Sequence, residues 1–227
     1  MIVAVHQPQY LPWLGYFDKM AKADIFCYLD NVQYKKNEWQ NRNRIKTAQG
    51  WQWLTVPVTY RFPEKIGQVR INRNMAWEKK HLKAISTSYG RAPFFSRYME
   101  LIRPVILSDH DELSTLNIAL AEALRQALKI DTRTVVVSQL PAMRENPTDR
   151  LIDICRHFGA DTYLAGQGGT NYMDVDRFDG SGVKVAVQHY EHPVYPQLFG
   201  KFISHLSVID LIFNCGPGSA AVIGKGA

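Results

Sequence analysis

The sequence predicts an α/β protein with a Rossmann-like, doubly wound and mostly parallel sheet, to which a β-hairpin and a helical insertion are added. Two observations predict this class. Short apolar runs alternate with stretches of helical periodicity, which is the rhythm of a parallel sheet covered by helices. The chain also has 227 residues, of which 46% are hydrophobic, and this is enough for one domain with a sizeable core. We therefore expect a single domain over residues 1–227.

The first predicted unit is a strand, a loop, a helix and a second strand. Residues 2–5 form an apolar run, and the prolines that follow prevent a helix from starting at once. From residue 13 onward apolar side chains recur at helical spacing, and residues 25–29 are apolar and aromatic, as in a buried strand. Such a unit favours parallel pairing, with ligands at the carboxyl ends of the strands, where His6 and Asp30 lie.

The hairpin and the helical insertion are predicted from the pattern in the middle of the chain. Residues 53–58 and 66–71 are segments of strand character around a turn, so they predict a hairpin, and Pro57 favours an edge position. A helical insertion is expected at about 76–130. Its three amphipathic helices are predicted over residues 77–88, 94–106 and 113–128.

The α/β alternation then returns. Strands are predicted at residues 134–137, 162–164 and 183–187, and helices at residues 147–158, 172–178 and 204–216. The glycine-containing residues 217–227 are expected to form a flexible tail.

Composition limits the classes of function. The net charge of +6 predicts attraction to anions, such as nucleic acid, nucleotide phosphates or a nucleotide-linked sugar. Cys27, Cys155 and Cys215 are odd in number, widely spaced and inside apolar runs, so we expect buried thiols and neither a disulfide framework nor a metal site. No apolar run reaches the roughly 20 residues of a membrane helix and no signal sequence is visible, so we expect a cytoplasmic protein without a membrane span.

Residues 6–19 concentrate polar and aromatic groups in the loop between the first strand and the first helix, which predicts a ligand site. A polar pair directly after a buried strand must be hydrogen-bonded if it is enclosed. The aromatic side chains have an alternative role as core residues at the top of the sheet. The candidate site residues of this segment are His6, Gln7, Tyr10, Trp13 and Lys19.

Residues 29–45 form a second candidate segment, which is polar and also aromatic. Asp30 could hold a cation or a sugar hydroxyl, the lysines and arginines could neutralise phosphates, and Trp39 could stack on a ring. The alternative is a solvated basic hairpin with an Asn-rich turn. The candidate site residues of this segment are Asp30, Gln33, Lys35, Lys36, Trp39, Gln40, Asn41, Arg42, Asn43 and Arg44.

A glycine-rich loop at residues 165–174 follows a predicted strand, which places glycines where backbone can approach a ligand closely. The loop matches neither a Walker A motif nor a GxGxxG fingerprint. Histidines that could serve as acid or base are His189, His192 and His205, and their wide spacing predicts no metal site. The remaining candidate residues are Gly166, Gln167, Gly168, Gly169, Asn171, Tyr172, His189 and Asn214.

Several of these segments resemble the WbqC-like protein family, and the resemblance covers essentially the whole chain. It is carried by HQPQYLPWLGYFDKM at 6–20, ADIFCYLDNVQYKKNEWQNRNRIK at 23–46, WLTVPV at 53–58, YLAGQGGTNYMD at 163–174 and LSVIDLIFNCG at 206–216. The resemblance implies a bacterial or archaeal cytoplasmic protein associated with surface polysaccharide or O-antigen synthesis. For some members it implies the attachment of glycine to an amino sugar.

The opening segment is also distantly similar to the HIGH-type nucleotidyltransferase and pantothenate synthetase superfamily, which binds ATP at the corresponding loop. In this alignment Trp13 and Tyr16 stand where that superfamily carries its two histidines, and Gly15 keeps the intervening glycine. The similarity makes Gly15 a candidate binding residue and ATP a candidate cofactor. Because the two histidines are replaced, adenylyl transfer does not follow from the fold.

The leading hypothesis is an enzyme that transfers an acyl or aminoacyl group, such as glycyl, to the amine of a nucleotide-activated amino sugar. Its catalytic candidates are His6, Lys19, Asp30 and His189. The alternative is a non-catalytic protein that binds a nucleotide sugar or a nucleic acid. Nucleic acid is disfavoured because acidic and amide residues interrupt the basic ones. The oligomeric state is left open.

Overall fold

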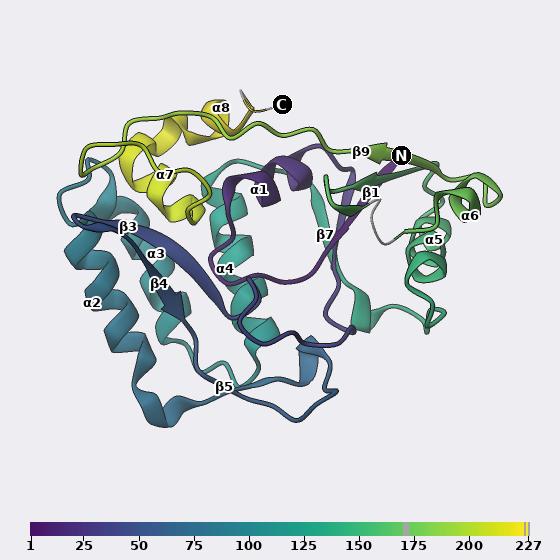
Figure 1. Ribbon diagram of the computed structural model, residues 1–227, viewed down its shortest axis with the longest axis horizontal. Coiled ribbons are helices and arrows are strands. Elements are labelled where there is room, and N and C mark those ends of the chain that lie inside the picture. Colours follow the sequence, from purple (N-terminus) through teal and green to yellow (C-terminus); the bar gives the residue numbers. More distant parts are fainter. Residues whose placement is uncertain (170–172, 225, 227) are drawn as a thin grey trace.

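A computed structural model of the protein describes residues 1–169, 173–224 and 226. Its centre is a sheet of five parallel strands in the order β7-β2-β1-β8-β9 (Figure 1). The strands are β1 (Ile2–His6), β2 (Ile25–Tyr28), β7 (Arg133–Val136), β8 (Thr162–Ala165) and β9 (Lys184–Val187). The parallel α/β sheet predicted from the alternation of apolar runs is therefore confirmed.

The strand order creates one point at which the direction of winding reverses. From β1 the chain crosses through helix α1 (Leu14–Ala21) to β2, continues outward to β7, and then returns to β8 on the other side of β1. The pairing of β1 with β8 ends at Ala4 and Leu164, whereas β1 stays paired with β2 as far as His6 and Tyr28. A crevice therefore opens between β1 and β8 beyond Ala4, where open parallel sheets bind ligands.

Alternate residues of the strands face two separate cores, which defines the doubly wound arrangement. Ala4 and Phe26 belong to a large cluster with α1, the helical insertion and the C-terminal helices. Val3 and Cys27 belong to a second cluster with helices α5 (Pro147–His157) and α6 (Val175–Asp179). The period of two along a strand explains why neighbouring residues face opposite sides.

The hairpin differs from the one predicted from the sequence. Strand β4 (Gly50–Thr55) pairs antiparallel with β3 (Arg42–Thr47) through a two-residue turn. The predicted pairing of residues 53–58 with 66–71 is wrong except at β5 (Val58–Thr59) and β6 (Arg70–Ile71), which pair over two residues. A short turn brings neighbouring strands together at a small loss of chain entropy, and this favours the local pairing.

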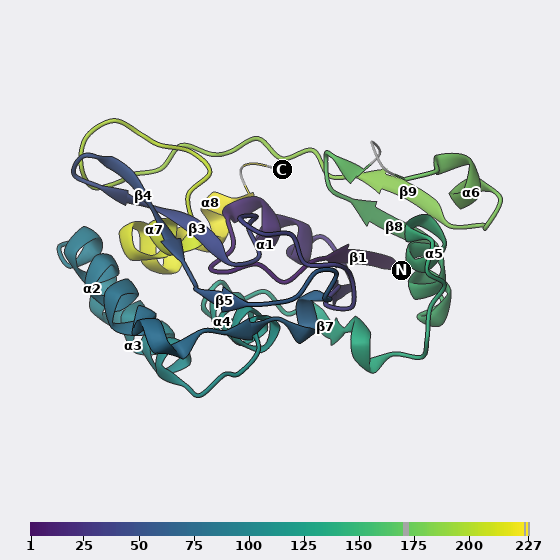
Figure 2. The same ribbon diagram turned by 60° about the horizontal axis from the view of Figure 1, so that its bottom comes forward.

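The three helices of the insertion are close to their predicted positions. They are α2 (Trp77–Tyr89), α3 (Phe95–Leu107) and α4 (Leu113–Ala127). Figure 2 shows α2, α3 and the β3–β4 hairpin at the opposite end of the molecule from α5, α6 and β9. Short 3-10 turns connect the larger elements at Ile66–Gln68, Arg73–Met75, Val137–Gln139 and Gly216–Gly218.

The C-terminal region corrects two expectations. The predicted helix at 204–216 begins later, as α7 (Val208–Cys215), because Ser207 caps it by accepting a hydrogen bond from the amide of Ile209. The segment expected to be a flexible tail contains a further helix, α8 (Ser219–Gly224), whose Ile223 is buried against the core. Within the described chain, none of the helices combines the length and the apolar character needed to cross a bilayer.

Candidate functional site

A cavity of about 780 Å³ lies at the carboxyl ends of β1 and β8, at the point where the strand order reverses. Its size is within the range of sites that hold small molecules and cofactors. Three parts of the sequence meet in it: the ends of β1 and β2 with α1, the start of α5, and the glycine-rich loop after β8. The polar side chains that line it are those of His6, Gln7, Lys19, Gln33, Lys35, Glu145, Arg150 and Tyr163.

Lys19 has the most unusual environment in this cavity. The residue is 3% exposed, and its amine donates a hydrogen bond to the carbonyl of Val5 at 2.9 Å, just beyond the last pairing of β1 with β8. Its nitrogen also lies 5.9 Å from the centre of the Tyr163 ring. Within the described chain it has no ion pair with a carboxylate. Burial therefore lowers the pKa of the Lys19 amine to about 7.

His6 lies at the end of β1 and is also held in its neutral form. Burial, together with the charge of Lys19, lowers the pKa of His6 to about 3. Its Nδ1 donates to the backbone carbonyl of Gln7 at 3.1 Å, because a carbonyl can only accept, and this leaves Nε2 as the acceptor nitrogen. The ring meets Tyr16 at a centroid distance of 4.7 Å.

Gln7 and Gln40 connect the two polar segments predicted from the sequence. The amide nitrogen of Gln40 donates to Gln7 Oε1 at 2.7 Å, and Gln40 Oε1 accepts from the backbone amide of Lys35 at 3.0 Å. Gln40 is buried, so both of its polar ends are satisfied inside the protein. The pair positions Gln7 and the Lys35 backbone at the wall of the cavity.

The glycine-rich loop contributes Gly166, Gly168 and Gly169 to the lining, as predicted for a loop after a strand. The amide of Gly169 donates to the carbonyl of Gly166 at 2.8 Å, which closes a tight turn. A Cβ atom at Gly166 or Gly168 would meet no atom of the described residues within 4 Å, so toward these residues the backbone is open to an approaching molecule. Gln167 is exposed, and the candidates Asn171 and Tyr172 lie outside the described residues.

Helix α5 was predicted from the sequence, but the contribution of its first turn to the cavity was not. Arg150 is half-buried in the cavity wall, and its guanidinium donates to the backbone carbonyl of Glu145 at 2.9 Å. A signal was present, since Asn146 and Pro147 mark the start of a helix. A helix that leads into a parallel strand must begin at the carboxyl edge of the sheet, so its first turn lies beside the ligand crevice.

Other candidate residues have structural partners away from the cavity. The Asp30 carboxylate accepts hydrogen bonds from the amide and the hydroxyl of Ser138, at 2.9 and 2.6 Å, and so joins the ends of β2 and β7. The Tyr10 hydroxyl donates to Nδ1 of the buried His81 at 2.8 Å. His189 is exposed after β9 and does not line the cavity.

Trp13 and Gly15 belong to an aromatic contact between the N-terminal loop and the segment before α7. The Trp13 ring stacks on His205 at a centroid distance of 5.4 Å and meets Tyr190 edge-on at 5.8 Å. A Cβ atom on Gly15 would lie 2.3 Å from this ring, which explains the glycine at that position. His192 lies beside the same stack, 5.1 Å from His205.

The remaining candidates of the second segment hold the hairpin in place or face solvent. Asn43 donates to the carbonyl of Leu11 at 2.7 Å, and Asn41 donates to the carbonyl of Val56 at 3.1 Å. Asn214 donates to the backbone within α7. Lys36 is exposed. Trp39, Arg42 and Arg44 lie together, but they do not line the switch-point cavity.

The cysteines are free thiols that the cavity does not use. Cys27 and Cys155 are buried, and burial raises the pKa of each thiol to about 12, so neither forms a thiolate nucleophile at neutral pH. Cys215 is half-buried in α7.

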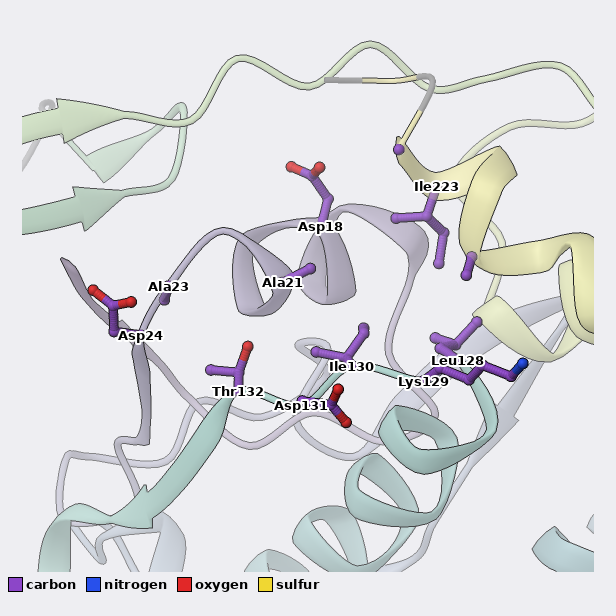
Figure 3. Close-up of a pocket in the computed structure, with 12 residues that line it drawn as sticks. Asp18, Ala21, Ala23, Asp24, Leu128, Lys129, Ile130, Asp131, Thr132 and Ile223 are labelled. Atoms are coloured by element: carbon purple, nitrogen blue, oxygen red, sulfur yellow. The ribbon is translucent and has the colours of Figure 1, made fainter. Parts of the chain in front are cut away.

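A smaller hollow of about 480 Å³ lies at the opposite, amino edge of the sheet, between α1, α8 and the start of β7 (Figure 3). Two of its acidic side chains, Asp18 and Asp24, come from separate elements and already have partners. Asp18 contacts Lys22 at 2.9 Å and Gln188 at 2.6 Å, and Asp24 accepts the backbone amide of Ile2 at 2.6 Å. Ligands of open parallel sheets bind at the carboxyl edge, so the switch-point cavity is the candidate site.

The fold and the cavity define a class: an α/β protein with a polar cavity at the switch point of a five-stranded parallel sheet. Within this class, the chain belongs to the WbqC-like protein family, whose family model matches residues 7–222. The chain is 38% identical over 218 residues to the uncharacterized protein Rv1507c of Mycobacterium tuberculosis (strain ATCC 25618 / H37Rv), and the match covers 94% of each protein. No solved structure matches the chain.

Proposed function

We propose that the protein is a cytoplasmic enzyme of surface polysaccharide synthesis that transfers an acyl group to the amine of a nucleotide-activated amino sugar. The acyl group is an aminoacyl group such as glycyl. The observation that supports this most is Lys19, a buried amine without a carboxylate partner in the described chain, in the wall of the switch-point cavity. Structural lysines are rarely buried without a counter-ion, and perturbed groups of this kind cluster at functional sites.

The proposed acyl transfer requires a base that can accept a proton near neutral pH. The lone pair of the sugar amine attacks the acyl carbonyl, a C–N bond forms, and the bond to the leaving group breaks with its electron pair. The attacking nitrogen must then release a proton. The neutral amine of Lys19 can accept it, since burial lowers its pKa to about 7, whereas His6 Nε2 can only accept a hydrogen bond in the same cavity.

Cationic groups around the rim support an activated, phosphate-bearing substrate. Lys35 is exposed at the cavity and Arg150 is half-buried in its wall, so both can meet phosphate oxygens. The open glycine backbone at Gly166 and Gly168 leaves room for a pyrophosphate to approach closely. Gln7 and Gln33 can pair with sugar hydroxyls. ATP stays a candidate cofactor that would activate the acyl donor.

A ligand screen on the full chain tests the proposal. Thermal unfolding is followed with nucleotide-linked amino sugars, ATP and aminoacyl adenylate analogues, since a ligand that binds only the folded state raises the apparent stability. We expect a nucleotide-linked amino sugar to raise the Tm, and Lys19→Met to abolish acyl transfer. Lys184→Met, an exposed lysine on β9, is the matched control and should keep full turnover.

Two results would contradict the proposal. If none of these ligands raises the Tm, the cavity does not bind an activated amino sugar. If a nucleotide-linked amino sugar binds but no acyl donor gives turnover, the protein is a binding subunit and the catalytic part of the proposal fails.

A further inference from the structure

A second hollow, of about 320 Å³, lies outside the switch-point cavity and shares no described lining residue with it. We call it the tryptophan hollow. It is lined by Asn37, Glu38, Trp39, Arg42, Arg44 and Trp53. These residues come from the loop before β3 and from the outer face of the β3–β4 hairpin. The reaction proposed above makes no use of them.

Two tryptophan rings of this hollow are open to solvent. Trp39 and Trp53 are each 36% exposed, their ring centres are 5.5 Å apart, and their planes are inclined by 48°. Grouped exposed aromatic side chains mark binding sites more often than ordinary surface. Two inclined rings in contact leave no parallel slot for a flat base. They can meet a puckered sugar ring, whose C–H groups point in several directions.

Two arginines are stacked on these rings. The Arg42 guanidinium lies 4.2 Å from the centre of the Trp53 ring, and that of Arg44 lies 5.6 Å from Trp39. Stacking occupies the face of a guanidinium and leaves its N–H edge available. Within the described chain neither forms an ion pair. The Arg44 guanidinium donates one hydrogen bond, to the carbonyl of His205 at 3.1 Å, and no described residue accepts one from the Arg42 guanidinium.

The charges of the hollow favour an acidic ligand that also carries hydroxyl groups. Two guanidinium groups face one carboxylate, that of Glu38, so the hollow has an excess of one positive charge. A guanidinium binds a carboxylate or phosphate through two parallel hydrogen bonds, while a carboxylate accepts from hydroxyls. Glu38 would repel the phosphates of a nucleic acid.

We propose that the tryptophan hollow binds an acidic sugar residue of a saccharide. The sugar ring contacts Trp39 and Trp53, its carboxylate is held by Arg42, and its hydroxyls donate to Glu38. Lys35 lines the switch-point cavity and Asn37 lines the hollow, so the bound saccharide lies beside the loop that forms one wall of the cavity. The inference does not depend on the acyl-transfer reaction.

Calorimetric titration of the full chain tests this site. The probes are an acidic saccharide, either tetragalacturonate or a hyaluronan tetrasaccharide, and maltotetraose and oligothymidylate for comparison. We expect an acidic saccharide to bind saturably and to shift the tryptophan fluorescence. Arg42→Ala and Trp53→Ala should each weaken its binding at least tenfold. Arg97→Ala, an exposed arginine stacked on Tyr98 outside the hollow, is the matched control and should bind as the wild type does.

The Lys19→Met variant separates this site from the proposed reaction, because it should still bind the acidic saccharide. The proposal is overturned if neither acidic saccharide binds, if maltotetraose binds equally well, or if Arg42→Ala leaves the affinity unchanged in a protein whose Tm matches the wild type. Tighter binding of oligothymidylate, with steep salt dependence, would also overturn it and identify a nucleic-acid surface.

Discussion

Lys19 is a residue whose protonation should depend strongly on folding. In the unfolded chain its amine has an ordinary pKa of about 10.4, whereas burial lowers the folded pKa to about 7. Between these values the unfolded state binds one more proton, so this residue makes the folded state more stable as pH rises. The effect is about 1.4 kcal/mol per pH unit.

The quantity to measure is the difference in unfolding free energy between the wild type and Lys19→Met. The cysteines titrate equally in both proteins, so their contribution cancels in this difference. Urea unfolding at pH 7.5 and 8.5 should show it growing in favour of the wild type by about 1.4 kcal/mol. The difference between Lys184→Met and the wild type should stay constant over the same range. A Lys19→Met difference that also stays constant would mean that Lys19 titrates normally.

Gly15 is a residue whose identity follows from one neighbour. A Cβ atom on Gly15 would lie 2.3 Å from the Trp13 ring, which contacts His205 and Tyr190. We expect Gly15→Ala to lower the unfolding free energy by about 1–3 kcal/mol, since overpacking forces the ring from its contacts. Gly218→Ala is the control, because a Cβ there meets no atom of the described part of the chain within 4 Å. Equal stability of the two variants in urea would show that Trp13 moves freely.

At the scale of elements, α8 is a segment with little helical signal in its own sequence that tertiary contacts hold as a helix. The helix has six residues, too few to be stable alone, but it contacts α1 and α7, and its Ile223 is 4% exposed in the core. We expect Ile223→Ala to lower the unfolding free energy by about 2 kcal/mol. The exposed Ala221→Ser should change it by less than about 0.5 kcal/mol. Urea unfolding distinguishes the two, and a neutral Ile223→Ala would mean that α8 adds nothing to the fold.

At the scale of the whole molecule, several histidines make the fold sensitive to acid. Burial lowers the pKa of His6 to about 3 and that of His81 to about 4, and it also lowers the pKa of His110, His192 and His205. Near pH 5.5 His6 and His81 together therefore bind about two more protons in the unfolded chain than in the folded one. Stability is lost as pH falls below the unfolded value of about 6.5.

We expect the unfolding free energy to fall by about 2.7 kcal/mol per unit between pH 6 and 5, from His6 and His81 together. His81→Gln should lower this slope by about 1.4 kcal/mol per pH unit, which corresponds to one proton. The exposed His189→Gln should leave the slope unchanged. Urea unfolding across this range measures the slope. A flat profile would contradict the neutral, buried state of these two side chains.

The fold could be predicted because its signals are local. The spacing of apolar side chains in α2, α4 and β2 appears within each segment, and it predicted their type and approximate bounds. The pairing of β3 with β4 was not visible in this way. Strand register decides which residues face out, and it placed Arg42, Arg44 and Trp53 together on a surface away from the cavity.

For the candidate site, too, local patterns predicted one part and tertiary contacts decided the other. The sequence by itself determined that His6, Gln7, Lys19 and the glycine-rich loop meet at one edge, because strand ends in a parallel sheet share that edge. Only the tertiary structure decided which polar groups are free for a ligand. Asp30 is engaged by Ser138, 108 residues away, whereas Lys19 is buried without a carboxylate in the described chain. A side chain's partners and its loss of water depend on contacts between distant segments, and no local pattern contains them.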